Sequence, residues 1–129
     1  MGRTIASIVA GLVGWLVIVT ILNFGLRAAI PGYHLAEATL EFTSAMKAGR
    51  LAEAALTSFA AGALVGWVAP RTKWAPWVVG FAILAIFLPV HIALWNKFPA
   101  WYHLTFLVPI VPLVVLGASL AGRRERVAA

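Results

Sequence analysis

The chain has 129 residues, of which 63% are hydrophobic and 11% are charged, and its formal net charge is +6. Soluble domains average about 45–50% apolar and about 25% charged residues, and a small domain has a large surface to cover with polar groups. The composition therefore excludes an independent soluble enzyme, a disordered chain and a fibrous repeat, and it indicates that most of the chain lies in lipid.

Long uncharged runs predict four transmembrane helices within a single membrane domain over residues 1–129. A helix needs about 20 apolar residues to cross the hydrocarbon core, and continuous apolar runs are not typical of barrel strands. The runs place the helices at about 4–27, 50–70, 74–96 and 101–121. The first run is longer than the core of a secretory signal and no small-residue cleavage site follows it, so we expect a retained anchor.

The one long connection, between the first two spans, predicts an amphipathic helix at about 33–48, after the turn signal Pro31-Gly32. Its apolar face would carry Leu35, Ala38, Phe42, Ala45 and Met46, and its polar face His34, Glu37, Glu41 and Ser44. Such a helix lies along the outer interface or folds over the mouth of the bundle. The expected fold class is therefore all-α, a four-helix transmembrane bundle with an additional outer amphipathic helix between helices 1 and 2.

The basic residues lie at the ends of the apolar runs, where they set membrane topology and are too close to the bilayer to bind nucleic acid. With both termini in the cytoplasm, the inner segments hold Arg3, Arg71, Lys73, Arg123, Arg124 and Arg126. The outer segments hold Arg27, Lys47, Arg50 and Lys97. The excess of inner basic residues predicts this orientation. Aromatic residues predict an outer interfacial belt of Tyr33, Trp95, Trp101 and Tyr102, whereas Trp15 lies mid-span and is expected to pack inside.

Small residues at every fourth position predict close contacts between helices. The clearest stripe lies on the second span and consists of Ala54, Ser58, Gly62 and Gly66. The first span offers Ala6, Ala10 and Gly14 at the same spacing. These stripes serve packing within the chain or a seam between copies of it, and the sequence alone leaves both open.

The residues that could carry chemistry fall on the predicted outer side: His34, Glu37, Glu41, His91 and His103. Imidazole and carboxylate groups together hold zinc, copper or iron, and two facing histidines hold a haem. An ionisable residue within a span is a functional hypothesis by default. In the plainer interpretation each histidine is hydrogen-bonded alone among the interfacial aromatic rings. The spacing matches no established ligand motif, so no metal or haem cofactor is predicted.

Catalytic motifs are absent from the sequence, which contains no P-loop, dinucleotide fingerprint, nucleophile elbow or zinc-protease motif. We therefore expect no catalytic residues. A proton-coupled exporter would need a carboxylate deep in a span. The acidic residues are expected outside the membrane or at helix ends, and they are Glu37, Glu41, Glu53 and Glu125.

The third-to-fourth helix hairpin, Leu88–Leu107, contains the pattern Trp95-x-x-x-Pro99-x-Trp101-Tyr102-His103, and the last span adds Pro112 followed by Leu116-Gly117. In these motifs the chain resembles small uncharacterised bacterial membrane proteins with four helices. The resemblance implies a four-helix membrane protein and supplies neither an activity nor site residues. The expected location is the bacterial inner membrane, with the chain crossing it several times.

The sequence leaves three functions open. The first is a small non-catalytic integral membrane protein, acting as an accessory or scaffold subunit of a larger membrane assembly or as a homo-oligomer. The second is a membrane protein with a periplasmic-side histidine and glutamate site for a metal or ligand. The third is a small transporter or channel. In all three the lipid bilayer is a partner and nucleic acid is not.

Overall fold

The computed structural model describes residues 1–128, without the side chains of residues 125, 126 and 128. The described residues form helices only, in the order α1 (Gly2–Ala29), α2 (Tyr33–Thr39), α3 (Ser44–Val68), α4 (Ala75–Ala93), α5 (Ala100–Leu107) and α6 (Ile110–Ala128). Within residues 1–128, four segments are long and apolar enough to cross a membrane: α1, α3, α4 and the stretch Ala100–Arg124, which joins α5 to most of α6. Arg126, one of the basic residues expected on the inner side, lies outside the described side chains.

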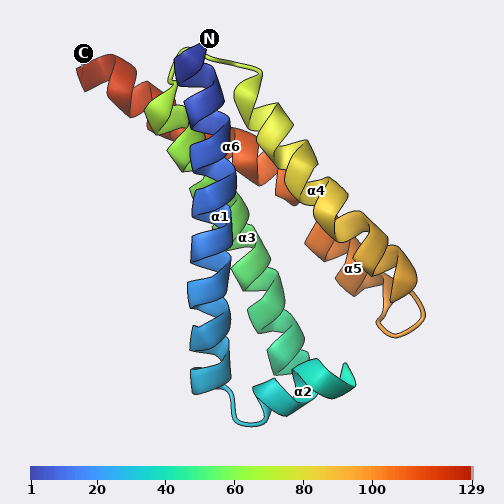
Figure 1. The fold of residues 1–129 in the computed structure, drawn as a ribbon. Coiled ribbons are helices and arrows are strands. Elements are labelled where there is room, and N and C mark those ends of the chain that lie inside the picture. The colour runs from blue at the N-terminus through green and yellow to red at the C-terminus, as the bar shows by residue number, and fades with distance from the viewer. Residues whose placement is uncertain (129) are drawn as a thin grey trace.

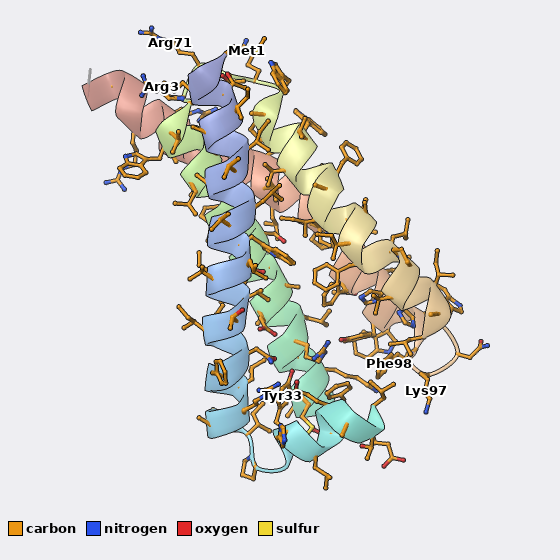
Figure 2. All side chains as sticks on the ribbon, viewed as in Figure 1. Met1, Arg3, Tyr33, Arg71, Lys97 and Phe98 are labelled. Carbon is orange, nitrogen blue, oxygen red and sulfur yellow. The ribbon has the colours of Figure 1, made fainter. Side chains whose placement is uncertain are left out.

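The long helices run alternately between two ends of the molecule (Figure 1). The N-terminus, the α3–α4 connection and the end of α6 lie together at one end, which we call the terminal end. Helix α2 and the α4–α5 turn lie at the opposite end, which we call the α2 end. Labelled side chains in Figure 2 show the same division, with Arg3 and Arg71 at the terminal end and Tyr33 and Lys97 at the α2 end. Helices α1 and α4 diverge toward the α2 end (Figure 1).

Helix α3 is the centre of the fold, since it packs on α6 along one side and on α1 along another. Glycines allow the α3–α6 contact, because a Cβ atom at Gly62 would overlap the backbone of Val114 and one at Gly66 would overlap the backbone of Ala118. Ser58, which continues this stripe, is buried and donates its hydroxyl to the carbonyl of Ala54 at 2.7 Å. The small-residue stripe is therefore occupied within the chain.

Helix α1 contacts its neighbours through Ser7, Gly11 and Trp15, the buried residues of this helix. This stripe lies one position beyond the expected Ala6, Ala10 and Gly14. Ala10 is half-buried, and a Cβ atom at Gly14 would overlap the Leu64 side chain. Trp15 packs edge-on against Phe87 with ring centroids 5.7 Å apart, which confirms its predicted internal position.

The amphipathic helix expected at 33–48 is two elements in the structure, because the chain turns between α2 and α3. Leu40 ends α2 in the left-handed region with φ of 61°, and the Thr43 hydroxyl caps α3 by accepting the backbone N–H of Met46 at 3.2 Å. Tyr33 and Met46 share a small core on either side of the turn, whereas Leu35 is 69% exposed. Helix α3 consequently begins at Ser44 rather than near residue 50.

The last span, expected as one helix at 101–121, is interrupted at Val108 and Pro109. Pro109 and Pro112 have no backbone N–H, so each removes one helical donor. Helical hydrogen bonding begins again directly after the interruption, since Leu113 donates its backbone N–H to the Pro109 carbonyl at 2.9 Å. Pro89, in contrast, lies inside α4 without ending it.

Candidate functional site

A cavity of about 380 Å³ lies between α1, α3, α4 and α5, with α2 at its rim. This volume is within the range of about 300–1,000 Å³ that is typical of small-molecule sites. Aromatic rings of Phe24, Phe87 and Phe106 form much of its apolar wall. Polar groups reach it from three helices, and they include Asn23 and Arg27 of α1, Glu37 of α2, and Arg50, Glu53 and Thr57 of α3.

Glu53 lies in the wall of this cavity, about three turns into α3. Glu53 is 9% exposed. Its Oε1 is the only buried side-chain oxygen or nitrogen without a hydrogen-bond partner among the described residues. Thr57, one turn further along, donates to the backbone carbonyl of Glu53 and not to its carboxyl group. A buried polar atom without a partner costs free energy, so this carboxyl group is open to a partner from outside the chain.

Arg50 lies one turn before Glu53 and joins α3 to two other elements. Its Nε donates to the hydroxyl of Tyr102 at 3.0 Å, and its Nη1 donates to the hydroxyl of Tyr33 at 2.9 Å. The guanidinium also lies over the ring of Phe42, with its carbon 4.7 Å from the ring centroid. Both tyrosines are almost completely buried. Since these partners are neutral, the positive charge of Arg50 has no carboxylate within ion-pair distance in the described part of the chain.

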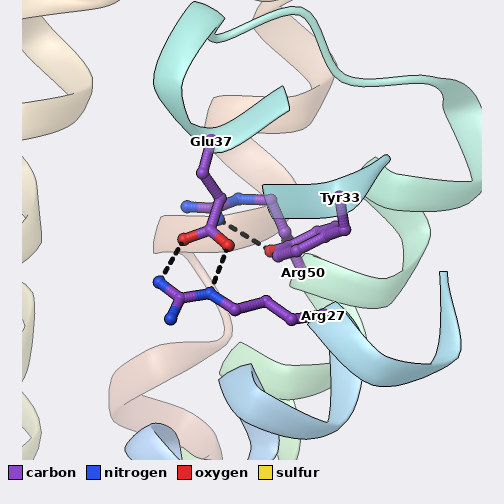
Figure 3. A network of polar contacts seen from close by, with 4 residues as sticks. All are labelled: Arg27, Tyr33, Glu37 and Arg50. Carbon is purple, nitrogen blue, oxygen red and sulfur yellow. Dashed lines mark hydrogen bonds and ion pairs between the residues drawn. The ribbon is translucent and has the colours of Figure 1, made fainter. Parts of the chain in front are cut away.

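Arg27 of α1 and Glu37 of α2 also line the cavity, and they form an ion pair (Figure 3). The guanidinium donates to both carboxylate oxygens, Nε to Oε1 at 2.7 Å and Nη2 to Oε2 at 3.0 Å. These hydrogen bonds favour the charged carboxylate and hold the pKa of Glu37 below its ordinary value. Burial of the neighbouring Tyr33 raises the pKa of its phenol, because the charged form loses solvation.

The lowered pKa of Glu37 predicts a contribution to stability that depends on acidity. The contribution is present at neutral pH and is lost as pH falls below the ordinary value of 4.5 and through the lower pKa of the folded state. The melting temperature in mild detergent should therefore fall between about pH 5 and pH 3, and less steeply in Glu37→Gln. Glu41→Gln, at an exposed position with no ion pair, is the matched control and should keep the full decrease. Identical pH profiles for Glu37→Gln and the unmodified protein would contradict this prediction.

His91 and His103 form a second polar feature beside the cavity. Their Nδ1 atoms lie 2.8 Å apart, and Nε2 of His103 lies 3.2 Å from the carbonyl oxygen of Trp95. Because a carbonyl only accepts, the neutral His103 carries its proton on Nε2, and His91 then donates from Nδ1 to the bare Nδ1 of His103. Both residues are buried, and they line a cavity of about 50 Å³ that shares Arg50 with the larger one.

The structure brings together two of the five residues expected to form an outer metal or ligand site. His91 and His103 meet, but Glu37 is paired with Arg27, and His34 and Glu41 are exposed. No group of three or more His, Asp or Glu side chains within the described residues is arranged to hold a metal ion. The histidines therefore bond to each other, while the polar cavity is built from other residues.

Sequence reasoning missed Arg50, Glu53 and the two tyrosines as site residues. A second span that begins near residue 50 puts Glu53 at a helix end, whereas α3 begins at Ser44. The available signal was the spacing of Arg50, Glu53 and Thr57, which puts all three on one face of a helix. Tyr33 and Tyr102 were expected in the interfacial belt but are buried on Arg50, whereas Trp95 and Trp101 are exposed.

Comparisons with protein-family models, curated proteins and solved structures find no match to this chain. Chemically, the cavity can bind a molecule through hydrogen bonds and through attraction between opposite charges. One carboxyl group and one guanidinium, neither of them in an ion pair within the described residues, lie three residues apart in the wall of a cavity that three phenylalanines also line.

Proposed function

We propose that the protein crosses the bacterial inner membrane four times and binds a small polar or amphipathic molecule in the cavity at its α2 end. Both termini lie in the cytoplasm in this proposal, so the cavity belongs to the periplasmic half of the molecule. The observation that carries the proposal is the buried Glu53 carboxyl group, whose Oε1 has no partner although it lines a cavity of about 380 Å³.

The outward surface of the helices supports a membrane location. Large apolar side chains are more than half exposed along α1 and α4, among them Leu16, Ile21, Phe81 and Ile86. Lipid is the solvent in which such surfaces are stable. Exposed tryptophans lie near the connections at both ends of the helices, with Trp67, Trp74 and Trp77 beside the α3–α4 connection and Trp95 and Trp101 beside the α4–α5 turn. This distribution is typical of the two membrane–water interfaces.

An unpartnered ionisable group inside a membrane segment is costly and is usually kept for function. On α1 the lining residues lie between Val19 and Arg27, in the half of the helix toward the α2 end. Trp15, about one turn nearer the terminal end, packs on Phe87 with centroids 5.7 Å apart, and Phe87 packs on Phe106 with centroids 4.9 Å apart. A cavity confined to one half of α1 favours a binding site over a continuous channel.

An accessory, scaffold or homo-oligomeric role stays a proposal, and the small-residue stripe of α3 does not support it. Gly62 and Gly66 lie against the backbone of α6 and are not free to meet a second chain. The cavity, by contrast, supplies a specific observation in favour of ligand binding, and for this reason we place ligand binding first.

Labelling of single cysteines tests whether the cavity opens to water on the periplasmic side. The natural chain has no cysteine, so only an introduced thiol reacts. Ala54 lines the cavity, whereas Leu56, two residues along the same helix, is 60% exposed on the surface that lipid would cover. A charged, membrane-impermeant thiol reagent applied from the periplasmic side should label Ala54→Cys at least about tenfold faster than Leu56→Cys, because lipid excludes the ionic reagent.

The unmodified protein is the blank in this experiment, and reagent applied from the cytoplasmic side is the second control. Equal protection of the two cysteines, or faster labelling of Ala54→Cys from the cytoplasmic side, would overturn the proposal of a periplasmic binding cavity.

A further inference from the structure

We propose that the ligand of this cavity is a zwitterion with a primary ammonium group, which binds Glu53, and a phosphate or carboxylate group, which binds Arg50. This inference rests on the proposed function, because it names the class of molecule that the cavity binds. It follows from two ionisable groups of the cavity wall, one acidic and one basic, that form no ion pair within the described residues.

The carboxyl group of Glu53 can accept a hydrogen bond from a donor on the ligand. Glu53 is more than nine-tenths buried, and its Oε1 has no hydrogen-bond partner. The nearby Thr57 hydroxyl donates to backbone carbonyls of α3 instead. A primary ammonium group offers three N–H donors and a positive charge, and charge-assisted hydrogen bonds of this kind are about twice as strong as neutral ones. A quaternary ammonium group has the charge but no N–H to donate.

The guanidinium of Arg50 can bind an anionic group of the ligand. It has five N–H donors, of which the hydroxyls of Tyr33 and Tyr102 take one each. The tyrosines hold the planar group in place from two sides while leaving its charge uncompensated. A fixed guanidinium fork matches the paired oxygens of phosphate or carboxylate, so it is suited to binding such a group.

The charges of the cavity favour a molecule that carries both signs. Its four ionisable side chains are Arg27, Glu37, Arg50 and Glu53, two basic and two acidic. Arg27 and Glu37 neutralise each other, so the remaining pair presents one group of each sign. Arg50 and Glu53 lie three residues apart, which puts them on one face of α3, so one ligand can meet both groups. An ethanolamine phosphodiester has this form.

The apolar wall allows two sources of this zwitterion. Phe24, Phe87 and Phe106 border the cavity beside the polar groups and can accept an apolar part of the ligand. The molecule is then either a soluble zwitterion that enters from the periplasm or the headgroup of an ethanolamine phospholipid from the surrounding bilayer. The recognised chemistry is the same in both cases, and the experiment separates them.

The test measures how far each compound slows the labelling of Ala54→Cys by the charged thiol reagent, with the protein in phosphatidylcholine nanodiscs. Glycerophosphoethanolamine should slow labelling at least about fivefold more than glycerophosphocholine, which has the same phosphodiester but no N–H on its cation. Ethanolamine and glycerol phosphate, which carry one kind of charge each, should also protect less. In a second arm, nanodiscs that contain phosphatidylethanolamine replace the free compound. Protection by the free compound identifies a soluble ligand, and protection by the lipid alone identifies a headgroup.

Glu53→Gln tests the assigned role of the carboxyl group in the same assay. The amide keeps the shape of the side chain but not its charge, so glycerophosphoethanolamine or its lipid should then protect no better than the choline compound. Glu41→Gln, at an exposed position on the α2–α3 connection, should leave the protection unchanged. If Glu53→Gln does not fold, the comparison of compounds on the parent Ala54→Cys protein still decides the question.

Two failures are distinguishable. If Ala54→Cys is not labelled in the absence of any ligand, the cavity is closed to water and both proposals fall. If it is labelled normally but neither form of the ethanolamine zwitterion protects it better than the other compounds, the binding cavity stands and the zwitterion proposal is overturned.

Discussion

Replacing Gly62 by alanine is expected to force α3 and α6 apart and to lower the free energy of unfolding by about 1–3 kcal/mol or more. The added Cβ would overlap the backbone of Val114, which cannot move aside as a flexible side chain can. Gly66→Ala should have a similar effect, because its Cβ would overlap the backbone of Ala118. In lipid, close approach of backbones contributes much of the attraction between helices, so a small separation removes many contacts at once.

Unfolding in mixed micelles of mild and denaturing detergent measures this effect, with Gly25→Ala as the matched control. Gly25 is also helical, but a Cβ atom there would have nothing within 4 Å. Alanine has the higher helix propensity, by about 0.8–1 kcal/mol, so the control should be neutral or slightly stabilising. If Gly62→Ala unfolded at the same detergent fraction as Gly25→Ala, the described α3–α6 contact would be wrong.

The positions of the four long apolar segments and the stripe containing Gly62 could be predicted from the sequence because they depend on local composition and helical spacing. The turn at Leu40 could not, because it leaves the apolar spacing intact. Phe42 and Met46 pack toward the core of the α2 end on both sides of the Thr43 cap, so the pattern appears continuous. A residue in the left-handed region is usually glycine or asparagine, and Leu40 gives no such signal.

The candidate site was less predictable because it depends on contacts between distant segments. The sequence puts His91 and His103 on the same predicted side of the membrane, and the structure places them in contact. The partners of Arg50 are Tyr33 and Tyr102, which are 17 and 52 residues away in the chain. No local pattern connects these residues. The depth of Glu53 differs from the expected helix end because it depends on where α3 begins, and the Thr43 cap sets that start.

Replacing Arg50 by methionine is expected to loosen the α2 end and to lower the free energy of unfolding by about 3 kcal/mol or more. Hydrogen bonds to charged groups contribute about 1.5–3 kcal/mol each, and the substitution removes two of them. It also leaves the hydroxyls of Tyr33 and Tyr102, whose residues are 0% and 2% exposed, without their partner. Methionine keeps an unbranched apolar stem but removes the guanidinium from the two hydroxyls and from the face of Phe42, so the loss reports chiefly on the guanidinium.

Lys47→Met is the matched control, because it also replaces a positively charged residue of α3 by methionine, one turn before Arg50. Its ammonium group has no hydrogen bond or ion pair with the described residues, so the variant should lose less than about 0.5 kcal/mol. A double-mutant cycle of Arg50→Met with Tyr102→Phe then isolates the pair, and a coupling of about 0.5–3 kcal/mol is expected for residues in contact. Additive effects of the two substitutions would mean that Arg50 does not tie α3 to α5. In that case the hydrogen bond to Tyr102 would not be what holds the guanidinium in place beside Glu53.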